Sequence, residues 1–120
     1  MIESGYGWLA LLLPLAFLLI NFAIRRGLSA TRIRETAVPE GLPWRTVSIP
    51  ANNGKRLFGC FIPQRDKAPV LVVVHGWSGN AEMMLPLAGP LFGAGCALLF
   101  IDARCHGQTE DDRFASLPRF

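Results

Sequence analysis

The chain has 120 residues, of which 51% are hydrophobic and 18% are charged. This length allows one domain at most, and the apolar fraction excludes an intrinsically disordered chain. The three cysteines have no paired spacing, which argues against a disulfide-stabilised secreted module.

The net charge of +3 originates near the N-terminus. Residues 1–24 contain one acidic and no basic side chain, residues 25–34 contain four arginines and no acid, and the remaining 86 residues contain eight of each sign. A nucleic-acid-binding protein carries positive charge over a folded face. Because the folded part of this chain is neutral, no nucleic-acid partner is predicted.

Residues 4–24 form an uncharged apolar segment. A helix of this length spans roughly 30 Å, the thickness of the hydrocarbon core of a bilayer. Tyr6 and Trp8 at one end are typical of the headgroup level, and Arg25 and Arg26 follow the other end. A cleavable signal peptide would begin with basic residues and end in small ones. We therefore predict a single-pass membrane anchor, and the positive-inside rule places the soluble part in the cytoplasm.

Residues 25–44 are predicted to form a basic juxtamembrane connector, because they contain prolines and show no sustained apolar period. Alternation of polar and apolar residues over 45–49 predicts a strand, and residues 55–62 predict a second. Between them, the Asn-Asn-Gly sequence at 52–54 is typical of a hairpin turn, since Asn and Gly accept positive φ. An antiparallel hairpin is therefore expected.

Residues 70–74 and 97–101 are continuous apolar runs, typical of strands buried on both faces of a parallel sheet. Asn80 is a candidate N-cap for a helix over residues 81–92, and the prolines in that segment predict a kink or a break. A strand, a helix and a strand in about 30 residues predict a right-handed βαβ crossover.

Each of these two strands is followed by a polar motif, His-Gly-Trp-Ser-Gly-Asn over residues 75–80 and Asp-Ala-Arg-Cys-His-Gly over residues 102–107. Both motifs are expected at the carboxyl ends of the strands, where such sheets bind ligands. Glycines in a turn let backbone amides point into a cleft, where they can stabilise an oxyanion. A turn that serves connectivity alone explains residues 75–80 equally well. Phosphate binding is disfavoured, because neither G-x-G-x-x-G nor G-K-[ST] occurs.

Taken together, the hairpin, the two strands, the helix and the two motifs resemble the first half of an α/β-hydrolase over residues 45–120. The esterase, thioesterase and peptidase-like serine hydrolases are the most similar members. The resemblance implies that the backbone N–H of Trp77 is one half of the oxyanion hole. The positions that support the motifs are His75, Gly76, Gly79, Asn80, Asp102, Arg104, His106 and Gly107. Neither a cofactor nor a metal is implied.

Two residues depart from the family pattern. Cys105 stands where the family usually has Gly, and Thr109 where Ser is usual. The first departure affects the backbone shape of the loop, since Cys accepts positive φ poorly.

The nucleophile is absent from the chain. The family carries it in a G-x-S-x-G elbow on the fifth strand, and no such motif occurs here. Ser78 is disfavoured as a substitute, because Asn80 replaces the second glycine. A thiol dyad of the adjacent Cys105 and His106 is disfavoured because neighbouring residues rarely aim at each other. A metal site lacks recognisable spacing in its candidate ligands, which are Asp102, His106, Asp111 and Asp112.

The sequence therefore predicts an α/β fold in three parts: a transmembrane helix (4–24), a connector (25–44) and an incomplete hydrolase domain (45–120), read as truncated within a helix that starts at 116–120. The complete protein is expected to hydrolyse an ester, thioester or amide through a covalent acyl-enzyme, with the bilayer and a small acyl substrate as partners. The 120 residues alone are expected to be inactive. Two alternatives stay open: a short non-catalytic membrane protein with a binding or assembly module, and a membrane-tethered nucleotide-binding unit.

Overall fold

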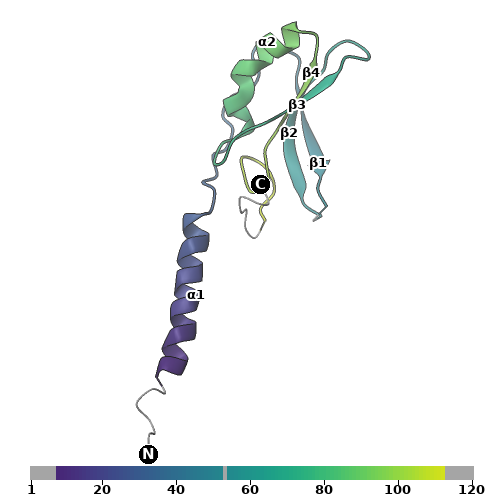
Figure 1. Cartoon of the computed structure of the whole chain (residues 1–120). Helices are drawn as coiled ribbons and strands as arrows, with labels where there is room; N and C mark the ends of the chain where they lie inside the picture. Colours follow the sequence, from purple (N-terminus) through teal and green to yellow (C-terminus); the bar gives the residue numbers. More distant parts are fainter. Residues whose placement is uncertain (1–7, 53, 113–120) are drawn as a thin grey trace, which may run out of the picture.

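The structure, a computed structural model, describes residues 8–52 and 54–112 (Figure 1). Its elements in chain order are α1 (Leu9–Gly27), β1 (Arg45–Pro50), β2 (Arg56–Ile62), β3 (Val70–Val74), the 3₁₀ helix η1 (Ala81–Leu87), α2 (Ala88–Gly93) and β4 (Ala97–Ile101). The predictions that concern residues 4–7, residue 53 and residues 116–120 lie outside the described part of the chain.

Helix α1 stands apart from the sheet, and only the connector joins its C-terminal end to the rest of the domain (Figure 1). The stretch Ala10–Gly27 is long and apolar enough to cross a membrane, and none of it is buried against the rest of the protein. Arg25 and Arg26 lie in the last turn of the helix, where cations interact favourably with the helix dipole. The predicted apolar helix is thus present, and it continues to Gly27.

The four strands form one sheet in the order β1-β2-β4-β3. β1 pairs antiparallel with β2, and β2 pairs antiparallel with β4. β3 and β4 pair in parallel over their full lengths, from Val70 opposite Ala97 to Val74 opposite Ile101. The predicted hairpin and the predicted parallel pair are therefore confirmed.

The segment that joins β3 to β4 is broken, as its prolines predict. Residues 81–87 form η1, and residues 88–93 form α2. Pro86 lies inside η1, and because it has no backbone N–H it cannot make the hydrogen bond that an α-helix requires there. Asn80 caps the segment, since its side-chain oxygen accepts a hydrogen bond from Met83 N at 3.2 Å.

One face of the sheet carries the core. Helices η1 and α2 cover this face, whose fully buried side chains include Ile62, Leu98 and Phe100. On β3, by contrast, Val70 and Val72 are 55% and 52% exposed. An apolar run of this kind is typical of a strand buried on both faces, but in the described part of the chain β3 lies at the edge of the sheet and these helices cover one face only.

The substitution N80A is expected to lower the free energy of unfolding by about 1–2 kcal/mol. Asn80 is 1% exposed, and its amide also donates to Ile33 O at 3.2 Å. Alanine therefore removes the donor to Ile33 O and the side-chain acceptor of Met83 N, which keeps only the backbone carbonyl of residue 80 as a partner. Urea unfolding of the full chain in detergent, followed by tryptophan fluorescence, measures the change. N80S keeps a capping oxygen and should cost less, so an N80A chain as stable as the parent would contradict the capping role.

Candidate active-site edge

Two loops meet at the carboxyl ends of β3 and β4, on the side of the domain that faces α1 (Figure 1). The first, residues 75–80, is called the histidine turn, and the second, residues 102–109, is called the aspartate loop. The two loops are joined by a pair of reciprocal hydrogen bonds. His75 Nε2 accepts from Ala103 N at 3.0 Å, and His106 Nε2 accepts from Ser78 N at 3.1 Å. The two imidazole rings lie 5.0 Å apart.

Both histidines are held as neutral rings by this network. The Nδ1 atoms lie 2.7 Å from backbone carbonyls, of Gly76 for His75 and of Arg104 for His106. Since a carbonyl can only accept, each Nδ1 carries the hydrogen and each Nε2 is the acceptor. Burial lowers the pKa of His106, which favours the same neutral form. Each imidazole therefore has both nitrogens occupied by the backbone, an arrangement that suits a structural role and not a catalytic base.

Asp102 is fully buried and joins three segments of the chain. Its Oδ1 accepts from Ala81 N, at the start of η1, and its Oδ2 accepts from Gln108 N, both at 2.7 Å. Its backbone carbonyl accepts from the Thr109 hydroxyl at 2.8 Å. Hydrogen bonds to a carboxylate are stronger than those between neutral groups. Asp102 therefore fixes the aspartate loop against the helix that follows the histidine turn.

The backbone turns sharply at residues that the glycine pattern does not indicate. In the histidine turn the residue with positive φ is Ser78 (φ 59°), not Gly76 or Gly79. Gly79 instead allows close packing, because a Cβ there would lie 3.0 Å from Gly76 O. In the aspartate loop Cys105 adopts φ 61°, the left-handed conformation that is costly for residues with a side chain.

A cavity of about 210 Å³ opens beside the histidine turn. Its lining residues are His75, Gly76, Trp77, Ser78, Gly79, Met83 and Met84. The Trp77 ring meets the His106 ring edge-on, with centroids 5.4 Å apart. The histidine turn, which carries the candidate oxyanion donor, therefore lines this cavity, and its Trp77 ring packs against His106 of the aspartate loop.

Three alternatives were disfavoured on the sequence: Ser78 as a nucleophile, a thiol dyad of Cys105 and His106, and a metal site. The side-chain positions do not support them. The Ser78 hydroxyl accepts from Thr31 N at 3.2 Å, and the nearby His106 Nε2 is occupied by the backbone N–H of Ser78 itself. The Cys105 Sγ lies 3.8 Å from Asp112 O, in a weak hydrogen bond. Arg104 pairs with Asp112. Across residues 8–52 and 54–112, no three histidine, cysteine or acidic side chains converge on a metal-sized site.

The connector contacts both loops, which the sequence did not indicate. Arg32 Nη1 donates to the carbonyls of Gly107 and Thr109 at 2.9 and 2.6 Å, and its Nη2 forms an ion pair with Asp111 at 2.7 Å. Thr36 N donates to the Glu82 carboxylate on η1. No short-range pattern could have predicted these hydrogen bonds, because their partners lie 46 to 77 residues away along the chain.

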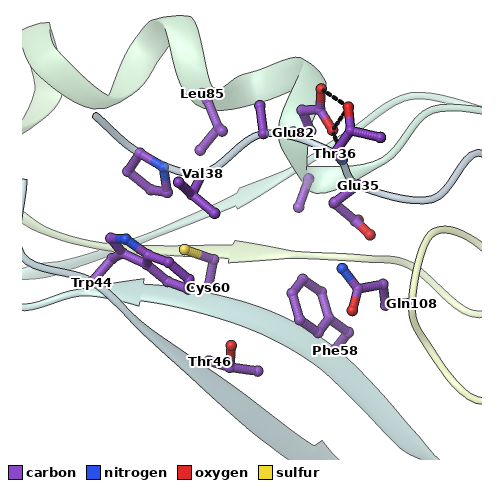
Figure 2. Close-up of a pocket in the computed structure, with 13 residues that line it drawn as sticks. Glu35, Thr36, Val38, Trp44, Thr46, Phe58, Cys60, Glu82, Leu85 and Gln108 are labelled. Carbon is purple, nitrogen blue, oxygen red and sulfur yellow. Dashed lines mark hydrogen bonds between the residues drawn. The ribbon is translucent and has the colours of Figure 1, made fainter.

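Glu35 lies in a second cavity, of about 280 Å³, between the connector and the core face of the sheet (Figure 2). Figure 2 shows its carboxyl group in this cavity close to Gln108 and Phe58. Both carboxyl oxygens are buried, with no hydrogen-bond partner within standard distance among the described residues. Burial and the neighbouring Asp102 carboxylate raise the pKa of Glu35 from its ordinary value of 4.5 to about 7.

The unfolding free energy is therefore expected to fall as the pH rises from about 4.5 to about 7. In this window the folded protein keeps the Glu35 proton that the unfolded chain has released, so deprotonation favours unfolding. The change is on the order of 1 kcal/mol, because Glu35 as a whole residue is only half-buried and solvent screens such a group even though its carboxyl oxygens are covered. Urea titrations at successive pH values measure it. E35Q should remove this pH dependence, whereas E40Q, at an exposed position on the connector, should retain it.

The described fold is similar to that of the esterase Pf2001 of Pyrococcus furiosus in three crystal forms. The TM-scores are 0.65, 0.63 and 0.63, at 19%, 20% and 20% sequence identity. The matches cover 71–73% of this chain and 34–35% of the esterase chain, so this chain spans about a third of the length of that protein. No protein-family model and no curated protein matches the sequence. The fold is esterase-like.

Proposed function

We propose that the chain from residue 45 onward is the N-terminal part of a membrane-anchored serine hydrolase domain that cleaves an ester, thioester or amide. The observation that carries the proposal is the pair of interlocked loops at the carboxyl ends of the neighbouring parallel strands β3 and β4. This edge is where open α/β sheets bind ligands. The esterase-like fold supports the same assignment.

In this proposal the backbone N–H of Trp77 donates to the oxyanion that forms on the substrate carbonyl. The aspartate loop keeps the turn in position through the bond from Ser78 N to His106 and through the Asp102 carboxylate. The nucleophilic serine and its base belong to parts of the complete protein that this sequence does not contain. The fragment alone is therefore inactive.

The reaction needs no group beyond the complete domain and water. The serine hydroxyl attacks the carbonyl carbon and gives its proton to the base, and the leaving alcohol, thiol or amine takes that proton as its bond to the acyl group breaks. Water then attacks the acyl-enzyme, which releases the acid and restores the serine. The amide of Trp77 acts in both steps, because each passes through a tetrahedral oxyanion.

Helix α1 is the membrane anchor in this proposal. Its apolar stretch is long enough to span a bilayer. Basic residues lie in its last turn, at Arg25 and Arg26, and beyond it, at Arg32 and Arg34. By the positive-inside rule the hydrolase domain lies on the cytoplasmic side.

The proposal is tested by labelling cell membranes with a fluorophosphonate that reacts with activated serines. An antibody against residues 54–112 should capture a labelled protein longer than 120 residues. In the purified complete protein, W77P removes the proposed donor and should lower kcat by about a hundredfold, whereas W77F keeps the backbone N–H and should retain most activity. Circular dichroism controls for folding. An unlabelled product of only 120 residues would instead favour a non-catalytic binding module.

A further inference from the structure

We infer that the substrate is a long-chain acyl ester dissolved in the membrane, and that it reaches the histidine turn directly from the bilayer surface. The inference rests on the proposed function and adds to it the class of substrate and the route of entry. It is carried by three observations: the short chain between α1 and the turn, the contacts that fix this chain, and the apolar side chains around the entrance.

The chain between the helix and the histidine turn is short. α1 ends at Gly27, and Thr31 N already donates to the Ser78 hydroxyl. Four residues span at most about 14 Å even when fully extended. The Ser29 hydroxyl also donates back to Arg25 O at 2.7 Å, which keeps the second of these residues close to the helix. The histidine turn therefore cannot move far from the end of α1.

The contacts of the connector fix the distance between the end of α1 and the histidine turn. Arg32 binds the aspartate loop through two carbonyls and Asp111. Asn80 of the histidine turn binds Ile33 O, and Glu82 of η1 binds Thr36. The connector is thus attached to both loops of the site within a few residues of the helix. With α1 in a bilayer, the carboxyl-end edge of the sheet faces the headgroups (Figure 1).

Exposed apolar side chains lie beside this edge. Leu28 and Ile33 of the connector are 54% and 46% exposed, and Met83, which lines the cavity beside the histidine turn, is 60% exposed. An acyl chain that passes from the bilayer over these side chains stays out of water, which lowers the cost of reaching the site. A small soluble substrate would gain nothing from this arrangement.

The positions of three arginines are consistent with a histidine turn that lies at the depth of the lipid headgroups. Arg25 and Arg26 end the helix, and Arg34 is exposed on the connector. Cations at this level are attracted to anionic headgroups of the cytoplasmic leaflet. They would hold the connector, and the loops bound to it, against the membrane surface.

The depth of the histidine turn is tested by fluorescence quenching in the full chain. Two single-tryptophan variants are reconstituted in phosphatidylcholine vesicles that contain a nitroxide on the lipid headgroup. W8F/W44F retains Trp77, and W8F/W77F retains Trp44, which precedes β1 near the opposite end of the sheet. We expect strong quenching of Trp77 and weak quenching of Trp44. Equal quenching of the two would overturn the inference.

Entry of the substrate from the bilayer is tested by lengthening the chain between α1 and Thr31. Ten Gly and Ser residues inserted between Leu28 and Ser29 separate Ser29 from the end of α1, keep the sequence of both loops and remove the restraint on distance. Trp77 should then lose most of its quenching. In the complete protein, the insertion should lower kcat/KM for a long-chain ester in vesicles and leave that for a soluble acetate ester unchanged.

The outcomes separate the inference from the proposed function. If the insertion leaves long-chain hydrolysis in vesicles unchanged, direct entry from the bilayer is wrong although the enzyme is a hydrolase. If neither ester is hydrolysed by the complete protein, the proposed function fails, and the inferred substrate class with it. Quenching of Trp77 does not depend on catalysis, so it decides the placement of the site in either case.

Discussion

Replacement of Asp102 by asparagine should lower the free energy of unfolding by about 2–4 kcal/mol. The Asp102 carboxylate is fully buried and accepts one backbone N–H on each oxygen, from Ala81 and from Gln108. Asparagine has the same shape but presents an NH₂ group to one of these two backbone N–H groups. That N–H then loses its acceptor and lies against a second hydrogen-bond donor. Urea unfolding of the full chain in detergent measures the loss.

The same substitution has a second readout that simple misfolding would not produce. The Asp102 charge is one of the causes that raise the pKa of Glu35, so D102N should bring that pKa closer to its ordinary value. The pH dependence of stability between about 4.5 and 7 should therefore weaken. D66N, at an exposed position between β2 and β3, is the matched control and should change stability by less than about 0.5 kcal/mol. A D102N chain that is as stable as the D66N chain would contradict the role given to Asp102.

Alanine at Gly107 should destabilise the chain by about 2–4 kcal/mol, since it combines a strained backbone with overpacking. Gly107 has φ +48°, and a Cβ there would lie 2.0 Å from Asp102 Oδ2. The buried carboxylate has its own hydrogen bonds and cannot move away without losing them. The thermal midpoint and the urea midpoint of the full chain both report the change.

Gly41 provides the control that separates the two causes. It has φ +68°, but no atom lies within 4 Å of the position of an added Cβ. G41A should therefore cost only the backbone strain, about 1 kcal/mol. In a D102A background the contact partner is gone, so G107A should cost less there than in the parent. Equal costs in the two backgrounds would show that the Asp102 contact is not what excludes a side chain.

Much of the fold could be predicted from the sequence because its signals are local. Alternation and a turn motif indicated the hairpin, continuous apolar runs indicated β3 and β4, and Pro86 indicated the break between η1 and α2. The apolar length of α1 could be read directly as well. The β-branched run of β3 indicates that the strand prefers burial, and it does not by itself indicate whether a covering layer is present.

The location of the candidate site could be predicted from the sequence, but the hydrogen bonds that join its loops could not. The two motifs were expected at one edge of the sheet, and the structure places them there. The reciprocal bonds of His75 and His106, the positive φ of Ser78 and the burial of Glu35 depend on loops brought together from distant parts of the chain. Arg32 looked like one member of a charge cluster, whereas the structure shows it bound to Gly107 and Thr109.

Because of the reciprocal bonds of His75 and His106, the histidine turn and the aspartate loop are expected to open together. The amide hydrogen of Ser78 is protected from solvent only while His106 is in place, and that of Ala103 only while His75 is in place. Opening of either loop therefore removes an acceptor from the other, and the two amides should exchange with deuterium as one kinetic unit. In physical terms the turn and the loop are expected to open as a single cooperative element, so a substitution that changes the shape of one is expected to change the exchange of the other.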